Sequence, residues 1–252
     1  MESQSIHRYF NDLRRHIEDL ETSQSESIQT AAQWCTEALK NKKVIHIFDT
    51  GHLVSHELIM RTGGLAAFTP LIFDGNLDNV NLWRQHNLPP ANSMTVLQRE
   101  QALLDWVFLQ GTLQAGDVLF IGSVSGVSLR PVELALRARK EGLKIIAITA
   151  VDFSRQLPSK HPTGKRLYEA ADLTLDNRAA YGDSSFQVDG FDRTICPHSG
   201  IAAAAIMWAI NAGIVEELVH SGIEPSVYSS VNLPDGPQDV VEVQSRYKER
   251  GV

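Results

Sequence analysis

Hydrophobic residues near the start of the chain recur with a helical period. They lie three or four positions apart, at Ile6, Tyr9, Phe10, Leu13, Ile17 and Leu20. This spacing predicts a first helix, and a second helix is expected over residues 25–40. We expect the two helices to pack against each other or against a second subunit.

Short apolar runs alternate with helical stretches over the middle of the chain. Four runs predict buried strands, at residues 44–48, 118–122, 144–149 and 171–175. One expected helix ends near Gly63 and Gly64, and three others span residues 96–109, 131–139 and 199–219. This alternation predicts an α/β fold, a three-layer doubly wound parallel sheet with N-terminal helices, whose ligands bind at the carboxyl ends of the strands.

The length of the chain, 252 residues, favours one domain with a sizeable core. Within it we expect N-terminal helices in residues 1–42, an α/β core in residues 43–220 and a C-terminal extension in residues 221–252. Residues 223–237 contain several prolines and are expected to run extended over the surface.

Composition argues against several classes of partner. The formal net charge is -7 and there is no dense run of Lys and Arg, which disfavours nucleic acid and anionic membranes. The two cysteines, Cys35 and Cys196, lie far apart, as is typical of a reducing compartment. The N-terminus lacks an apolar signal core and no apolar run approaches a membrane span, so we expect a cytoplasmic protein with a small partner.

The strongest chemical signal is the segment from Ser123 to Ser128, which we call the serine loop. It directly follows an apolar strand and precedes a helix with Pro131 in its first turn. The hydroxyls of Ser123, Ser125 and Ser128 can donate to phosphate oxygens, and Gly126 lets the backbone approach an anion. The start of the helix adds unpaired N–H groups. The alternative is an ordinary turn that caps the helix.

The serine loop resembles the Ser-x-Ser-Gly-x-Ser/Thr phosphate loop of the sugar isomerase (SIS) domain family. Other segments look like single-domain bacterial SIS proteins that isomerise or bind phosphosugars, and they cover most of the chain after the second helix. These segments are residues 50–52, 57–58, 61–64, 161–167, 171–172 and 176–177. The resemblance implies an SIS-type, flavodoxin-like sheet, a phosphosugar ligand and dimers with sites at the subunit interface.

The resemblance also supplies candidate catalytic residues. Glu57-Leu58-x-x-Arg61 looks like the Glu-Leu-x-x-Arg segment of sedoheptulose 7-phosphate isomerases, in which the glutamate moves protons at the sugar carbons. Glu57 is therefore the candidate base, and His198 is the candidate for the partner histidine that those enzymes carry on a late helix. Without the resemblance, Glu57 would be a solvated residue that pairs with Arg61.

The turn after the first strand departs from those isomerases. They have a Gly-x-Gly-x-Ser turn, whereas this chain has Asp49-Thr50-Gly51-His52-Leu53. By resemblance, Thr50, Gly51 and His52 stay candidates for substrate contacts. Asp49 would repel a nearby phosphate unless it faces a sugar hydroxyl or a cation. A substrate different from that of those isomerases therefore stays an alternative.

Three more residues are expected near the same end of the sheet. His161 is a candidate proton carrier and Lys165 a candidate partner for phosphate or carboxylate, although both also suit a surface loop that starts a helix. Asp183 is a candidate for binding sugar hydroxyls, or it forms a turn.

Metal and thiol chemistry are weaker alternatives. His52 and His56, four apart and next to Glu57, would share a helix face that could bind a divalent metal, with Asp49 or His161 as a third ligand. We favour a capping His52 with a solvent-facing His56, and we assign no metal or other cofactor. Cys196 near His198 resembles a thiol nucleophile, but nothing orients the pair and a structural cysteine is favoured.

These observations predict a phosphosugar-binding protein that isomerises a small sugar phosphate by proton transfer through an enediol. Two alternatives stay open: a module that senses a phosphosugar without converting it, and a metal-dependent sugar-phosphate lyase that would need His52 and His56. We expect a homodimer or a higher homo-oligomer.

Overall fold

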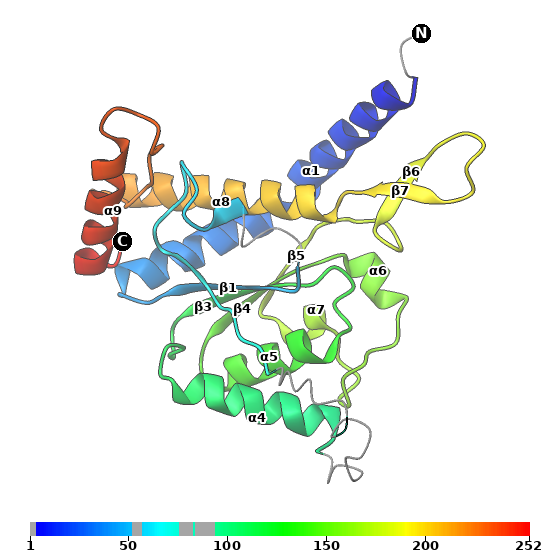
Figure 1. The fold of residues 1–252 in the computed structure, drawn as a ribbon, viewed down its shortest axis with the longest axis horizontal. Helices are drawn as coiled ribbons and strands as arrows, with labels where there is room; N and C mark the ends of the chain where they lie inside the picture. Colours follow the sequence, from blue (N-terminus) through cyan, green and yellow to red (C-terminus); the bar gives the residue numbers. More distant parts are fainter. Residues whose placement is uncertain (1–3, 52–56, 76–82, 84–93) are drawn as a thin grey trace.

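The computed structural model describes residues 4–51, 57–75, 83 and 94–252. Five parallel strands form one sheet in the order β2-β1-β3-β4-β5 (Figure 1). They are β1 (Ile45–Asp49), β2 (Phe68–Pro70), β3 (Val118–Gly122), β4 (Lys144–Thr149) and β5 (Leu173–Asp176). The doubly wound, flavodoxin-like sheet is therefore confirmed. The edge strand β2 was missed because three residues that end in a proline give no period-2 pattern.

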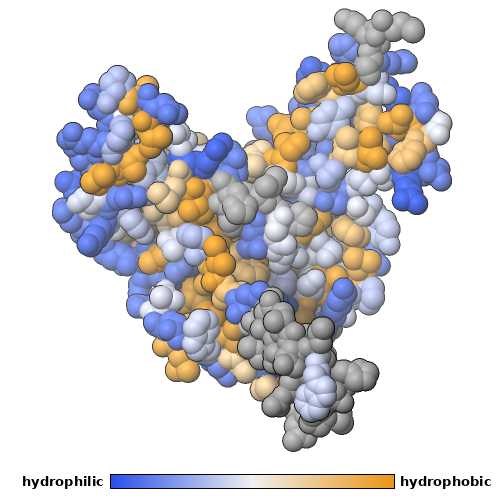
Figure 2. Space-filling model, in the orientation of Figure 1, coloured by the Kyte–Doolittle hydropathy of each residue, from blue (hydrophilic) through white to orange (hydrophobic). Residues whose placement is uncertain are grey.

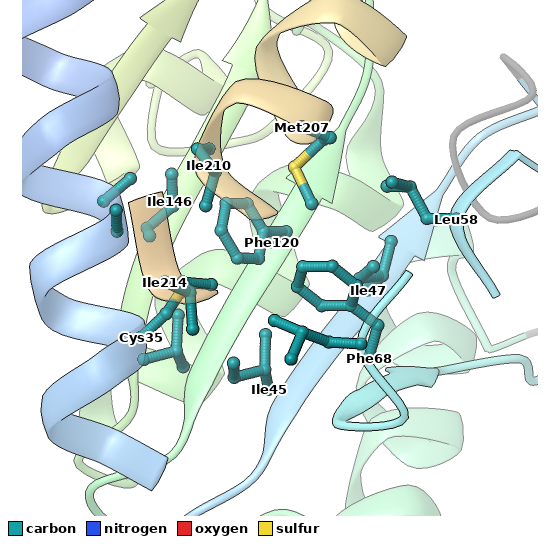
Figure 3. Packing of buried hydrophobic residues seen from close by; sticks show 14 of the residues in the cluster. Cys35, Ile45, Ile47, Leu58, Phe68, Phe120, Ile146, Met207, Ile210 and Ile214 are labelled. Carbon is teal, nitrogen blue, oxygen red and sulfur yellow. The ribbon is translucent and has the colours of Figure 1, made fainter. Parts of the chain in front are cut away.

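Side chains of the central strands alternate between two buried cores, as the period of a strand requires. One core faces helices α1 (Gln4–Lys40) and α8 (Ser199–His220), where Ile47 and Phe120 meet Met207 and Ile210 (Figure 3). The other core faces α4 (Val96–Leu109), α5 (Leu129–Lys140) and α7 (Leu167–Ala170), and contains Leu119. The protein therefore has three layers, with the sheet in the middle.

The expectation of two N-terminal helices is wrong, because α1 is one helix of 37 residues. The polar stretch that separates the two apolar patterns bonds back to its own helix. The hydroxyls of Thr22 and Ser23 donate to the carbonyls of Glu18 and Asp19 at 2.8 and 2.7 Å. Gln24 also accepts a hydrogen bond from the backbone N–H of Asp176 at 2.9 Å, so the middle of α1 is fixed to the end of β5.

A two-stranded hairpin, β6 (Ser184–Gln187) and β7 (Thr194–Pro197), follows the sheet and was not predicted. Together with the N-terminal part of α1 it forms an arm that projects from the body (Figure 1). Arg8 joins the two parts, because its guanidinium lies 5.5 Å from the Phe186 ring and donates to the Gln187 carbonyl at 2.8 Å. Hydrophobic side chains lie on the surface of the arm (Figure 2). Phe10 and Phe191 are among its exposed residues.

The predicted helix over residues 199–219 is confirmed as α8. Our statement that no apolar run approaches a membrane span is wrong for this helix, whose 22 residues are long and apolar enough. Length and composition alone are weak evidence, since core helices share both. In this structure α8 packs along α1 and over the sheet (Figure 1).

The C-terminal extension is more ordered than expected. Residues 223–237 were expected to lie extended over the surface, but Ser226 is fully buried and Val227 forms an antiparallel bridge with Leu65. A further helix, α9 (Gly236–Arg250), follows, with proline in its first turn and the left-handed Gly251 as its C-cap. A short helix, α6 (Val151–Arg155), follows β4.

A buried carboxylate fixes the amino ends of the two central strands. Asp117 accepts hydrogen bonds from the backbone N–H groups of Val44 and Gln114 at 3.0 and 2.8 Å. It also lies 3.2 Å from Nε2 of the buried His46. Burial works to raise the pKa of Asp117, but the hydrogen bonds from His46 and the two N–H groups outweigh it and lower the pKa.

We expect Asp117→Asn to lower the free energy of unfolding by about 3 kcal/mol at neutral pH, because an amide cannot accept all three hydrogen bonds. The folded pKa is depressed, so the stabilisation is present above the unfolded pKa of about 3.9 and is lost as the pH falls through the folded pKa. Urea unfolding at several pH values should show the two proteins converging in acid. The exposed control Asp152→Asn should change stability by less than about 0.5 kcal/mol. If the free energies of unfolding of the parent protein and of Asp117→Asn differed by the same amount at every pH, this assignment would be contradicted.

Candidate functional site

The serine loop connects β3 to α5 at the carboxyl end of the sheet. Its carbonyl groups bond to neighbouring segments. The Val124 carbonyl accepts from Ala150 N–H at 2.9 Å, and the Gly126 carbonyl accepts from Leu167 N–H at 2.8 Å. The Val127 carbonyl accepts from Lys160 N–H at 3.0 Å. These three carbonyls therefore fix the loop to the neighbouring segments.

Gly126 is required where the loop crosses β4. Its φ of +61° lies in the left-handed region, where residues with a side chain are strained. A Cβ atom there would lie 2.7 Å from Thr149 Oγ1 and 3.1 Å from Ser154 Oγ. The sequence analysis expected Gly126 to let the backbone approach an anion, and that expectation stays a prediction. The groups that approach Gly126 in the structure are Thr149 at the end of β4 and Ser154 of α6.

Apart from the Ser123 N–H, which donates to the Ile148 carbonyl at 3.0 Å, the donors of the loop are not used within the described part of the chain. Ser128 is the N-cap residue of α5, yet its side chain makes no capping hydrogen bond. The hydroxyls of Ser123 and Ser125 likewise have no protein partner there, nor do the backbone N–H groups of residues 124–128. The loop is thus rich in free donors next to the start of a twelve-residue helix. An anion fits this arrangement better than a capping turn does.

A cavity of about 380 Å³ opens beside these donors, and we call it the loop cavity. It is lined by Thr50, Ser123, Val124, Ser125, Ser128, Phe153 and Asp183. The structure therefore brings two predicted substrate residues, Thr50 and Asp183, to the three serines. Thr50 is fixed by its N–H and hydroxyl, which both donate to the Gly122 carbonyl at 3.1 and 3.2 Å.

Asp183 has two contacts besides its place in the cavity wall. It has a positive φ of 72°, and its carboxylate accepts from the N–H and the hydroxyl of Ser199 at 3.3 and 2.7 Å. It thus fixes the start of α8 to the loop cavity. Asp49 lies on the other side, against Gly122, where a Cβ atom would be 3.0 Å from Asp49 Oδ1. Asp49 does not line the loop cavity.

His198 is buried at the start of α8, one residue from Ser199. Its Nε2 has no hydrogen-bond partner in the part of the chain that the structure describes. The His198 ring lies 5.0 Å from the ring of His16 and 5.9 Å from that of Tyr9, both on α1. A buried imidazole nitrogen without a partner is costly, which makes this cluster a candidate for chemistry.

His16 was missed by the sequence analysis, because it looked like one more polar residue on an amphipathic helix. Its Nε2 lies 3.1 Å from the Asn177 carbonyl, so Nε2 carries the proton and Nδ1 is an acceptor. Burial and then the neighbouring His198 lower the pKa of His16, against a smaller opposite effect of the Asn177 carbonyl. His16 is therefore neutral at physiological pH.

Three predicted residues lie away from the loop cavity. Glu57 is half-buried and pairs with Arg61 at 3.3 Å. The buried His161 has both ring nitrogens engaged, with Glu133 at 2.6 Å and Thr163 at 2.7 Å. Lys165 is exposed and does not line the cavity. A fourth predicted residue, Gly51, is exposed next to Thr50 with a φ of 111° and does not line the cavity either.

The metal hypothesis falls partly outside the described residues, because His52 and His56 are not among them. Over residues 4–51, 57–75, 83 and 94–252, no group of three or more His, Cys, Asp and Glu side chains is arranged to hold a metal ion. Cys196 is half-buried at the end of the hairpin with a positive φ of 58°. Cys196 and His198 make no hydrogen bond in the part of the chain that the structure describes, so the thiol alternative gains no support.

Comparisons with known proteins agree with this fold. The family model of the SIS domain matches residues 8–150. A UPF0309 protein from Streptomyces coelicolor is 32% identical over 241 residues, which cover 95% of this chain and 92% of that protein. A UPF0309 protein from Listeria innocua is 29% identical over 247 residues, which cover 97% and 96%.

Solved structures of two phosphoheptose isomerases share the fold. The protein from Francisella tularensis has a TM-score of 0.52 and 14% identity, over 86% of this chain and 99% of that chain. The protein from Neisseria gonorrhoeae has a TM-score of 0.53 and 18% identity, over 84% and 97%. At these identities the likeness concerns the fold alone.

Gly126→Ala tests the close packing of the serine loop. We expect it to lower the free energy of unfolding by about 3 kcal/mol, because backbone strain adds to a clash with the end of β4. The matched control is Gly222→Ala at the end of α8, where φ is +70° and nothing lies within 4 Å of a Cβ atom. The control has the strain without the clash and should lose only about 1 kcal/mol. If Gly126→Ala and Gly222→Ala lost the same free energy of unfolding in thermal and urea experiments, the loop would not be tightly packed at Gly126.

Proposed function

The chain belongs to the SIS domain family, and from this premise we propose that it binds a small phosphosugar with its phosphate group in the serine loop. One observation carries the proposal. Ser123, Ser125 and Ser128 line a cavity at the start of α5. The N–H groups of residues 124–128 donate to no described residue, while the carbonyls of Val124, Gly126 and Val127 accept hydrogen bonds from other segments. Such a set of donors selects an anion.

The lining of the loop cavity implies that a phosphate ester would be held there by hydrogen bonds and not by an ion pair. The lining residues that the structure describes include no Lys or Arg. Hydrogen bonds to an ionised acceptor are shorter and stronger than neutral ones, so serine hydroxyls and N–H groups suffice. Thr50 and Asp183 at the cavity wall are placed to meet sugar hydroxyls, since their carboxylate and hydroxyl oxygens accept hydrogen bonds.

The reaction we propose is aldose–ketose isomerisation. A base removes the proton from the carbon next to the carbonyl, the carbonyl oxygen takes up a proton, and the resulting enediol is reprotonated on the neighbouring carbon. Glu57 is the proposed base and His198 the proposed acid. The resemblance to sedoheptulose 7-phosphate isomerases and the buried His198 Nε2 support these roles. The phosphate in the loop would fix the reacting carbons relative to both groups.

We also propose that the protein forms a dimer with shared sites, as the family resemblance implies. An apolar groove of about 840 Å³ runs between α1 and α8, with small residues such as Ala209 and Gly213 in its floor. Exposed apolar residues on the arm support the same proposal. A second subunit would add groups to the loop cavity, from which Glu57 of the same chain is absent.

The alternative function is a module that senses a phosphosugar. It is favoured by the pairing of Glu57 with Arg61, four residues later, which is the arrangement of a solvated helix pair. The sensing module uses the same serine loop but requires no base. The lyase alternative would need His52 and His56, which lie outside the described residues.

Ser125→Ala tests the phosphate site directly. We expect the affinity for phosphosugars and for inorganic phosphate to fall by about tenfold to a hundredfold, because a hydrogen bond to a charged group is lost. Isothermal titration calorimetry measures this loss. Ser245→Ala on α9 is the control and should leave affinity unchanged, since Ser245 is exposed and far from the sheet end. Unchanged affinity of Ser125→Ala for every phosphate would rule out the loop assignment.

Glu57→Gln separates the enzyme from the sensor. The amide keeps size and hydrogen bonding but removes the base, so we expect turnover to fall by about a hundredfold or more while binding and melting temperature stay near the parent values. Exchange of the substrate's carbon-bound hydrogen with deuterated water reports the enediol step. Arg61→Gln breaks the same ion pair but keeps the carboxylate, and should retain exchange. Full exchange activity in Glu57→Gln would leave phosphosugar binding as the surviving function.

A further inference from the structure

A second hollow adjoins the loop cavity on the other side of Thr50. It measures about 310 Å³ and is lined by Phe48, Asp49, Thr50, Leu71, Ile72, Phe73 and Arg130. Thr50 lines both spaces, so they meet at the carboxyl end of β1. A ligand whose phosphate lies in the serine loop has this hollow as its nearest neighbouring space.

Most of the hollow is apolar and is built from fixed elements. The rings of Phe48 and Phe73 stack at 5.3 Å with an interplanar angle of 27°. Leu71 continues the sheet ladder beyond β2, because its N–H donates to the Ile47 carbonyl at 2.8 Å. The guanidinium of Arg130 covers the Phe73 ring at 5.7 Å. The wall is thus held by strand backbone and by ring packing.

The one cation among the described residues of this wall, Arg130, is already paired. Arg130 follows the serine loop closely in sequence, which makes it an obvious phosphate ligand. Its Nε and Nη2 instead donate to the two carboxylate oxygens of Glu100 at 2.7 and 2.9 Å. This bidentate pair neutralises the charge and turns the flat guanidinium face toward Phe73. A charged ligand group therefore gains little there, whereas an apolar group meets two aromatic rings and two aliphatic side chains.

We propose that this hollow, the apolar subsite, binds an uncharged apolar substituent of the phosphosugar, such as an alkyl or acyl group. This inference rests on the proposed function, since the phosphate in the serine loop is the anchor. It narrows the substrate class to phosphosugars that carry such a substituent within reach of Thr50. Thr50 lines both spaces, and Asp49 lines the hollow alone, so both side chains suit sugar hydroxyls between the anchor and the substituent.

A series of n-alkyl phosphates, from methyl to hexyl, tests the subsite without needing the right sugar. The phosphate is constant, so affinity measured by calorimetry should rise by about threefold to fourfold per methylene once the chain reaches the hollow. The matched compound 6-aminohexyl phosphate ends in a cation and should lose most of the gain over methyl phosphate. If 6-aminohexyl phosphate bound more tightly than hexyl phosphate, the proposal would be overturned, because the hollow would then be a cation site.

Two phenylalanine variants locate the effect. Phe73→Ala should flatten the dependence on chain length while leaving the affinity for methyl phosphate within about twofold. Phe108→Ala is the matched control, because Phe108 is also half-buried against the same core and lies under an arginine, Arg137, at 5.5 Å. The control should keep the full dependence on chain length, and thermal melting shows whether both variants are folded.

The outcomes separate the two claims. If methyl phosphate binds and Ser125→Ala weakens it, but affinity does not rise with chain length, the apolar subsite is wrong and the proposed function stands. If affinity rises equally in the parent protein and in Phe73→Ala, the chain binds elsewhere and the subsite is also wrong. If no phosphate in the series depends on Ser125, the proposed function itself fails.

Discussion

The site depends on the close packing of Gly126 against Thr149 at the end of β4 and Ser154 of α6. This contact holds the serine loop so that the carbonyls of Val124, Gly126 and Val127 point into the scaffold and accept hydrogen bonds. The N–H groups of residues 124–128 donate to no residue in the part of the chain that the structure describes. The serine hydroxyls then add to a surface that already favours negative charge, at the start of a long helix.

The parts of this structure that could be predicted from sequence are those set by local periodicity. The buried strands β1, β3, β4 and β5 and the helices α4, α5 and α8 were found within a few residues of their bounds, because each has a clear apolar pattern. The elements that were missed depend on contacts between distant segments. The hairpin packs its Phe186 against Arg8 and Tyr9 of α1, and α1 continues through its polar stretch partly because Gln24 bonds to Asp176.

The candidate site shows the same division. The three serines, Thr50 and Asp183 were predicted as binding residues and do line one cavity, since the turn residues after parallel strands share one edge of the sheet. His16 could not be predicted, because its importance comes from meeting His198 across 182 positions of chain. Glu100 was missed for a similar reason, and its pairing with Arg130 changes what the loop's neighbouring cation can do. Sequence gives the residues near a strand end, but not which charges are already paired.

If neutral donors alone hold the phosphate, selectivity among phosphosugars depends on the rest of the ligand. Every phosphosugar brings the same anchor, and each hydrogen bond to it contributes about 1.5 to 3 kcal/mol whatever the sugar. An apolar group contributes about 0.8 kcal/mol per buried methylene, so a two- or three-carbon substituent equals one serine contact. The loop cavity and the apolar subsite meet at Thr50, and the paired Arg130 adds no competing charge. Discrimination among phosphosugars at this end of the sheet is therefore expected to follow the substituent that reaches Phe48 and Phe73, while the serine loop fixes its position.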